Sequence, residues 1–248
     1  METAFSVVIV SLFPEMFASI TQDGVVGRAF KQGRANCWLI NPRDYALDKH
    51  CTVDDKPYGG GPGMLMKVQP LRDAIAAAKR QLPSAKVVYL SPQGRPINQV
   101  LVGATVAKKE IILICGRYEG IDERLLETDI DEEWSLGDFV LSGGEIAAMA
   151  VIDACVRTLP DALGNNDSAT NDSFSEGLFD HPQYTRPEEL AGQQVPSVLL
   201  SGDHQKIETW RMQHALGKTW LKRPDLLASL QLTDEQQALL ADFRRKMD

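Results

Sequence analysis

Three short apolar runs in this sequence each lead into a segment rich in glycine and polar residues. They are VVYLSPQG at 87–94, IILICGRYEG at 111–120 and SLGDFVLSGGE at 135–145. Glycine lets the main chain approach a ligand closely, where a side chain would clash. Because the ends of parallel strands share one edge of a sheet, we expect the three segments to build one ligand site.

A fourth glycine-rich segment lies at residues 57–64, with four glycines and two prolines in eight positions. This composition excludes a helix or a regular strand. Two interpretations remain open at this point, a flexible surface turn and a shaped loop that binds a ligand.

Five charged residues near these segments are candidates for chemistry: Glu119, Asp138, Glu145, Arg157 and Asp172. Arg157 has a simpler explanation, because a cation near the C-terminus of a helix is favoured by the helix dipole. Asp172 also has one, because an aspartate in a polar segment is usually an exposed turn residue. The residues alone do not decide whether Arg157 and Asp172 have a chemical role or only these simpler ones.

Motifs of several common enzyme classes are missing from the sequence. No G-x-G-x-x-G follows a strand, which disfavours a Rossmann dinucleotide site. Residues 217–219 resemble the end of a P-loop, but they follow a helix and lack its first glycine. No G-x-S-x-G surrounds a serine, and the four histidines lack zinc-site spacing, so a serine hydrolase and a zinc enzyme are both disfavoured.

The chain has 248 residues, of which 44% are hydrophobic and 24% charged, as in an ordinary globular protein. Its net charge of −8 argues against a nucleic-acid partner, but the charge is uneven. Residues 117–133 hold eight acids against two arginines, whereas residues 201–223 hold five bases against two acids. An acidic protein can therefore carry a basic surface. A solvated face is the alternative explanation of each run.

Four scattered cysteines without a C-x-x-C pair indicate a reduced compartment, and we expect the cytoplasm. The first residues lack the basic region of a signal peptide, and a proline soon follows the first apolar run. We therefore expect neither a secretion signal nor a membrane span, and no membrane partner.

Alternating strand and helix patterns predict an α/β domain with a mostly parallel sheet. The predicted strands are 5–10, 38–40, 87–90, 111–115 and 139–141, and the predicted helices are 14–20, 70–82, 96–109 and 145–159. Residues 44–55 are expected to form a loop. The last helix is apolar on nearly every side, which indicates burial in a core or in an oligomer interface.

A polar stretch at 161–177 without apolar periodicity indicates a linker. Beyond it we expect a strand at 198–200 and helices at 204–216, 225–230 and 233–246. In the last helix, Thr233 and Gln236 fit a capping box. The C-terminal part is therefore expected to be a small, mainly helical domain.

Six motifs occur together in a specific order along nearly the whole chain. They are DKPYGGGPGM at 55–64, LSPQGR at 90–95, CGRYEGIDER at 115–124, GDFVLSGGE at 137–145, DSF at 172–174 and YTRP at 184–187. In these motifs the sequence resembles the bacterial tRNA (guanine-N1)-methyltransferases, the TrmD family of the SPOUT superfamily.

The resemblance implies a parallel sheet whose C-terminal portion forms a trefoil knot, followed by a small helical domain that holds tRNA. On this basis we expect a cofactor-binding methyltransferase domain at 1–162, a flexible linker at 163–176 and a helical tRNA-binding domain at 177–248. A knot is rare among chains in general, so this expectation rests on the family alone. The resemblance also implies a homodimer whose active sites are shared between protomers.

The resemblance further implies that S-adenosylmethionine is the methyl donor and that tRNA is the substrate. The residues expected to bind the cofactor are Tyr89, Leu90, Ser91, Pro92, Gln93, Gly94, Gly116, Tyr118, Glu119, Ser135, Leu136, Gly137, Asp138, Phe139, Val140, Leu141, Gly143 and Gly144. Those expected to bind the substrate are Gly59, Gly60, Asp180, Lys206 and Arg211.

The implied reaction methylates N1 of the guanosine immediately 3′ of the anticodon. By resemblance, Asp172 is the general base and Arg157 stabilises the charge that develops on guanine O6. A free aspartate has a pKa near 3.9, so its surroundings or the acceptor must assist the proton transfer. The family also implies Mg²⁺, with Glu119 near the ion, although the sequence holds no diagnostic magnesium motif.

Two other functions remain possible from the sequence. One is a non-catalytic module that binds RNA or a nucleotide through the glycine loops and the basic helix around Arg211. The other is a SPOUT enzyme that acts on another RNA or another base.

Overall fold

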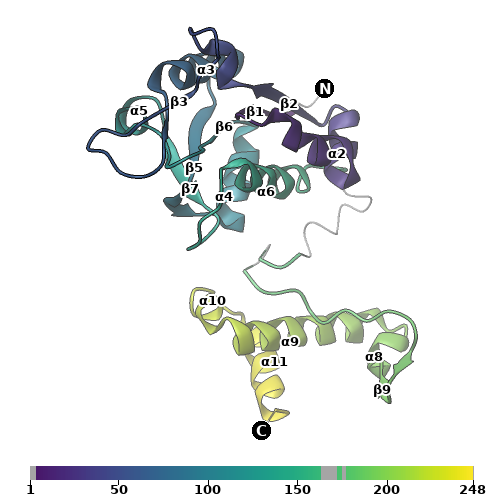
Figure 1. Cartoon of the computed structure of the whole chain (residues 1–248). Helices are drawn as coiled ribbons and strands as arrows, with labels where there is room; N and C mark the ends of the chain where they lie inside the picture. Colours follow the sequence, from purple (N-terminus) through teal and green to yellow (C-terminus); the bar gives the residue numbers. More distant parts are fainter. Residues whose placement is uncertain (1–3, 163–171, 175–176, 248) are drawn as a thin grey trace. The chain divides into compact units, whose positions relative to one another are not determined.

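The computed structural model describes residues 4–162, 172–174 and 177–247 (Figure 1). The chain divides into two compact units, Met1–Asn166 and Asp167–Asp248, and each contains its own hydrophobic clusters.

The first unit is built on a five-stranded sheet in the order β2-β1-β6-β5-β7, and every neighbouring pair is parallel. The strands are β1 (Phe5–Val10), β2 (Ala35–Ile40), β5 (Lys86–Pro96), β6 (Glu110–Cys115) and β7 (Glu132–Ser135). Four of the predicted strands are confirmed, although β2 begins earlier and β5 continues further than expected. The predicted α/β class with a parallel sheet is thus correct.

Helices cover both faces of this sheet (Figure 1). They are α1 (Ala18–Gln22), α2 (Gly24–Lys31), α3 (Val68–Gln81), α4 (Gln99–Lys108), α5 (Glu123–Thr128) and α6 (Glu145–Val156), with 3-10 turns at Pro14–Phe17 and Pro42–Tyr45. Alternate strand residues face opposite sides, as the period of a strand requires. Val7, Val88 and Leu113 pack in a cluster with residues of α2, α4 and α6. Val8, Val87 and Ile112 pack in the other cluster with residues of α3 and α5.

The predicted strand at 139–141 is wrong. Phe139 and Val140 are 53% and 83% exposed and pair with no strand of the described chain. The strand that precedes this segment is instead β7, in a stretch whose acidic composition is unusual for a strand. Glu132 of β7 forms ion pairs with Lys86 and Arg95 of the neighbouring β5, and such cross-strand pairs stabilise a sheet.

The segment at 44–55 is not wholly a loop. It overlaps the second 3-10 turn and ends in β3 (Asp54–Asp55), which pairs antiparallel with β4 (Leu65–Met66). Residues 57–64 between these two strands form neither helix nor strand, as predicted.

The second unit is mainly helical, with α8 (Ser197–Leu200), α9 (His204–Lys222), α10 (Pro224–Ala228) and α11 (Asp234–Arg245). Its hydrophobic cluster is centred on Leu178, Leu216 and Leu240. The capping box of Thr233 and Gln236 is confirmed at the start of α11. The boundaries expected for the two domains and the linker remain predictions, because much of the linker, residues 163–171 and 175–176, lies outside the described residues.

The predicted strand at 198–200 is wrong, because these residues belong to the helical turn α8. A run of three apolar residues is too short to distinguish a strand from a helix by its period. The strands of this region lie earlier, in the hairpin of β8 (Glu189–Leu190) and β9 (Gln193–Gln194). Ala191 and Gly192 connect them with positive φ angles, as a tight hairpin turn requires.

Candidate active site

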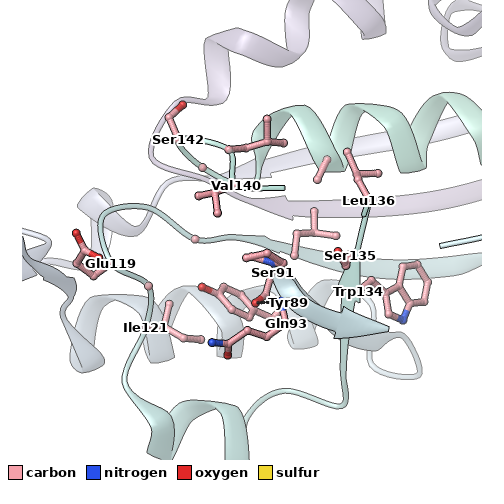
Figure 2. Close-up of a pocket in the computed structure, with 18 of the residues that line it drawn as sticks. Tyr89, Ser91, Gln93, Glu119, Ile121, Trp134, Ser135, Leu136, Val140 and Ser142 are labelled. Carbon is pink, nitrogen blue, oxygen red and sulfur yellow. Dashed lines mark hydrogen bonds between the residues drawn. The ribbon is translucent and has the colours of Figure 1, made fainter. Parts of the chain in front are cut away.

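A pocket of about 380 Å³ lies at the carboxyl ends of β6 and β7 and beside the middle of β5. Its walls come from residues 89–93 within β5 and from the segments around residues 116–121 and 134–144. Figure 2 shows Val140 and Leu136 on one side of the pocket and Tyr89, Gln93 and Ile121 on the other. The three segments predicted to build one site do line one pocket, although residues 89–93 lie within β5 and the third strand is β7.

The residues expected to bind the cofactor all line this pocket, with the exception of Gly94 and Asp138. Seven further lining residues were not among those expected to bind the cofactor, although Gly120 and Ser142 belong to the predicted segments: Gly120, Ile121, Glu123, Leu126, Trp134, Ser142 and Ala147. Ile121 and Leu126 follow the glycine segment after β6. Their apolar side chains, in that motif and in α5, were the sequence signal that could have indicated them as wall residues.

The glycines of these walls permit contacts that no other residue would allow. A Cβ atom at Gly116 would lie 2.5 Å from the hydroxyl oxygen of Tyr89. One at Gly144 would lie 2.8 Å from the Cα atom of Cys115. Gly144 N also donates a hydrogen bond to Gly116 O at 3.0 Å. The segments after β6 and β7 are therefore in direct main-chain contact at the floor of the pocket.

Beneath this contact lies a buried charge. Glu145, the first residue of α6, is fully buried, and its Oε2 atom lies 2.9 Å from Arg117 Nε. The two atoms are at ion-pair distance without forming a directed hydrogen bond. Ser11, just beyond β1, donates to Glu145 Oε1 at 2.8 Å. A buried carboxylate requires such partners, because an unpaired charge in the interior is strongly unfavourable.

The Arg117 side chain makes three further contacts. Its Nη1 donates to Ser142 O at 3.2 Å, its Nη2 lies 3.6 Å from the sulfur of Met16, and its guanidinium lies 4.4 Å from the centre of the Phe13 ring. A Cβ atom at Gly143 would lie 2.3 Å from Arg117 Nε. The arginine therefore connects the ends of β1 and β6 with the segment that leads into α6.

Tyr89 forms part of the pocket wall and is only 7% exposed. Burial raises the pKa of the Tyr89 hydroxyl to about 12, and the neighbouring Glu133 and Cys115 contribute in the same direction. Burial also raises the pKa of Cys115 well above that of a free thiol. Both groups are thus neutral at physiological pH, and neither is activated as a nucleophile.

The glycine-rich segment at 57–64 lies beside the pocket rather than in its wall. Glu119 N donates to Met64 O at 2.9 Å, and a Cβ atom at Gly63 would lie 2.5 Å from the Glu119 side chain. Gly59 and Gly60 have positive φ angles, and a Cβ atom at either position would meet no heavy atom within 4 Å. Their open surroundings leave room for a substrate. The assignment of Gly59 and Gly60 to substrate binding stays a prediction.

The expected Mg²⁺ site is not supported. Glu119 and Glu123 both line the pocket. Across the described part of the chain, no three or more His, Cys, Asp or Glu side chains gather in a way that could hold a metal ion.

Arg157 caps the C-terminal end of α6, whereas the pocket adjoins the first turn of that helix. A helix of 12 residues is about 18 Å long, at 1.5 Å per residue. The pocket and Arg157 of one chain therefore lie at opposite ends of α6.

Asp172 and the other predicted substrate residues beyond the linker belong to the second unit. The segment that holds Asp172 is anchored there, because Ser173 Oγ accepts a hydrogen bond from Asp180 N at 3.0 Å and Phe174 packs edge-on against Phe179. Asp180 also accepts from Gln183 at 2.9 Å.

The two basic residues predicted to bind substrate each form an exposed ion pair on α9. Lys206 pairs with Asp203 at 2.9 Å and Arg211 with Glu208 at 2.7 Å. Exposed pairs of this kind contribute little to stability and exchange readily for other partners.

Replacing Glu145 by Gln should test the importance of the buried ion pair. The variant keeps the side-chain shape but leaves Arg117 without its counter-charge, so the free energy of unfolding should fall by about 3 kcal/mol. Urea unfolding measures this loss. The control is Glu123→Gln, an exposed carboxylate in the same pocket wall, which should change stability by less than about 0.5 kcal/mol. Equal stabilities of the two variants would contradict the assignment.

The raised pKa of Tyr89 predicts a loss of stability at alkaline pH. The hydroxyl loses its proton near pH 10 in the unfolded chain and near pH 12 in the fold. This contribution is therefore complete below pH 10 and is lost as the pH rises towards 12. Between pH 9 and 11, the wild type should lose about 1.3 kcal/mol more than Tyr89→Phe in urea unfolding.

The control for this titration is Tyr58→Phe, which removes the hydroxyl of a fully exposed tyrosine. Its stability should follow that of the wild type across the same pH range. A Tyr89→Phe profile parallel to the wild type would show that the hydroxyl titrates normally.

Comparison with known proteins identifies the family. The family model described as tRNA (Guanine-1)-methyltransferase TrmD matches residues 5–229. The tRNA (guanine-N(1)-)-methyltransferase of Pseudoalteromonas translucida is 60% identical over 241 residues, which cover 96% of this chain and 94% of that protein. The protein of the same name from Proteus mirabilis is 60% identical over 241 residues, or 96% of each chain. With a match that spans most of its length, the chain belongs to the TrmD family of tRNA (guanine-1)-methyltransferases.

Proposed function

We propose that this protein transfers a methyl group from S-adenosylmethionine to N1 of the guanosine immediately 3′ of the anticodon in tRNA. The observation that carries the proposal is the 60% identity, over 96% of the chain, to proteins named for this tRNA activity. The position in the anticodon loop and the methyl donor are carried over from the sequence resemblance, and the pocket described above supports the choice of donor. The enzyme would act in the cytoplasm, where its tRNA substrate is found.

The pocket at the strand ends suits S-adenosylmethionine in size and character. Its volume of about 380 Å³ lies within the usual range of small-molecule sites. Its main-chain walls offer N–H and C=O groups to an adenine and a ribose, while Leu136, Val140 and Ile121 offer apolar surface. When bound there, the cofactor supplies an activated methyl group on a sulfonium centre. The protein then has to position the acceptor nitrogen in line and remove its proton.

We assign these tasks to residues outside the pocket. Asp172 accepts the N1 proton, which makes the nitrogen nucleophilic as the methyl group is transferred. Arg157 faces guanine O6, where negative charge accumulates once N1 is deprotonated, and a fixed cation there stabilises the transition state. Gly59, Gly60, Asp180, Lys206 and Arg211 contact the tRNA. We derive no step through a metal ion.

The homodimer with shared active sites is carried over from the family resemblance, and the length of α6 supports it. Arg157 lies about one helix length from the pocket of its own chain. A dimer can instead bring the arginine of one copy to the pocket of the other. The exposed side of α6 supports this arrangement. Ile146 is 48% exposed and Ala150 is exposed one turn further along, so the first unit leaves two apolar residues of the helix uncovered, followed by the exposed Asp153. We also expect the trefoil knot of the family around this pocket.

The base and position of methylation can be determined directly. Total tRNA from cells that lack the enzyme, incubated with the protein and S-adenosylmethionine, should gain one methyl group on the guanosine 3′ of the anticodon. Mass spectrometry of nuclease fragments locates it. A methyl group on another nucleoside would indicate a related enzyme with a different target. No transfer under any ionic condition would indicate a non-catalytic binding module.

Replacing Asp172 by Asn should separate binding from catalysis. The variant keeps the size and hydrogen-bonding capacity of the side chain but cannot take up the N1 proton, so single-turnover methyl transfer should slow at least about 100-fold. Binding of S-adenosylmethionine, measured by calorimetry, should be unchanged. The control Asp73→Asn removes an exposed carboxylate of α3 and should retain full activity. An active Asp172→Asn enzyme would refute the assignment of the base.

A further inference from the structure

The second unit contains a pocket of its own, of about 460 Å³, and of its lining residues only Lys206 has been assigned a role so far. It lies along one face of α9, where Lys206, Trp210 and Gln213 follow one another at helical spacing. Asp203, Gln205 and Thr209 complete this face, and Val198 of α8 forms the opposite wall. The pocket therefore combines one large aromatic ring with several polar side chains and one cation.

Trp210 is held in place by other aromatic rings. His214 stacks on it with ring centres 4.0 Å apart and ring planes 26° apart. His214 is itself fixed, because its Nδ1 lies 2.8 Å from Trp210 O and its ring packs edge-on against Phe243 at 5.6 Å. Tyr184 and His181 approach Trp210 at 6.2 Å and 6.3 Å. The indole ring is thus a preorganised surface rather than a mobile side chain.

The Tyr184 ring extends the aromatic surface towards solvent. It is 50% exposed and is tilted by 58° to the indole. Trp210 itself is half-buried. An accessible tyrosine therefore lies next to Trp210, although it is not among the residues that line the pocket.

The polar wall can recognise both a ring edge and a charge. The Gln213 amide nitrogen is fixed by Asp242 Oδ2 at 2.7 Å, which orients the side chain beside the pocket. Lys206 is 73% exposed, and its ion pair with Asp203 is of the weak surface type that a phosphate can replace. The surrounding residues 201–223 carry five bases against two acids, which favours an anionic ligand.

We propose that this α9 pocket binds an unstacked nucleobase of the tRNA, with the base against Trp210 and its phosphate beside Lys206. Single-stranded RNA is recognised in this way, by bases stacked on aromatic rings, hydrogen bonds to base edges and basic residues along the backbone. The pocket volume of about 460 Å³ is sufficient for a nucleotide. The inference rests on the proposed function, because it names a contact of the tRNA substrate.

Replacing Trp210 by Leu tests the stacking contact. The change keeps apolar volume against His214 but removes the flat ring, so Kd for unmodified tRNA should rise roughly ten- to a hundredfold. Trp210→Phe keeps an aromatic face and should stay within about threefold of the wild type. Trp220→Leu is the matched control, since Trp220 packs under Arg244 away from the pocket, and it should change Kd less than about twofold. Thermal unfolding confirms that each variant is folded.

The salt dependence of binding separates stacking from charge. Lys206→Gln should lower the slope of log Kd against log salt by about one, as expected for the loss of one phosphate contact. Trp210→Leu should weaken binding at every salt concentration without changing that slope. Equal losses of slope in both variants would show that Trp210 only supports the basic surface, and would overturn the proposal.

Photocrosslinking identifies the ligand. RNA carrying 5-iodouracil in the anticodon loop should crosslink to the α9 peptide that contains Trp210. A folded Trp210→Leu variant with wild-type tRNA affinity, together with crosslinks confined to other peptides, overturns the proposal while leaving methylation by the wild type intact. If the wild type neither binds nor methylates tRNA, the proposed function itself fails, and the α9 pocket then has a different partner.

Discussion

The buried ion pair between Glu145 and Arg117 is the interaction on which the pocket depends. It joins three places far apart in the sequence, because Glu145 begins α6, Arg117 follows β6, and Ser11, 134 residues before Glu145, adds a hydrogen bond from the end of β1. A charge at this depth is tolerated only while its partners are in place. The segments that carry those partners are therefore held in one arrangement, next to Gly143 of the pocket wall.

Local sequence signals predicted the parts of the fold that local physics determines. The apolar strands, the helix α3 and the capping box of Thr233 each follow from a pattern within a few residues. The strand β7 could not be predicted in this way, because its Glu132 is stabilised by Lys86 and Arg95 of another strand. The β8–β9 hairpin was missed because Ala191 occupies a turn position that usually requires glycine or asparagine.

The candidate site also has some parts that local sequence patterns predict and others that depend on contacts between distant segments. Glycine-rich strand ends predicted the location of the pocket and most of its walls, since glycine there has a direct steric reason. The partners of Glu145 and the apolar contribution of α5 depend on contacts between distant segments, which one sequence does not reveal. The aromatic surface around Trp210 also depends on such a contact, because Tyr184 lies 26 positions before Trp210 and packs near it only in the folded chain.

The glycines that line the pocket have an evolutionary consequence, because at these positions only main-chain atoms can meet a ligand. Substitutions change side chains, so they have little means of adjusting the main-chain groups presented there. At Gly116 and Gly144 any larger residue would also displace neighbouring atoms. A competitive inhibitor that bound only these main-chain groups would therefore leave few routes to resistance that preserve the enzyme.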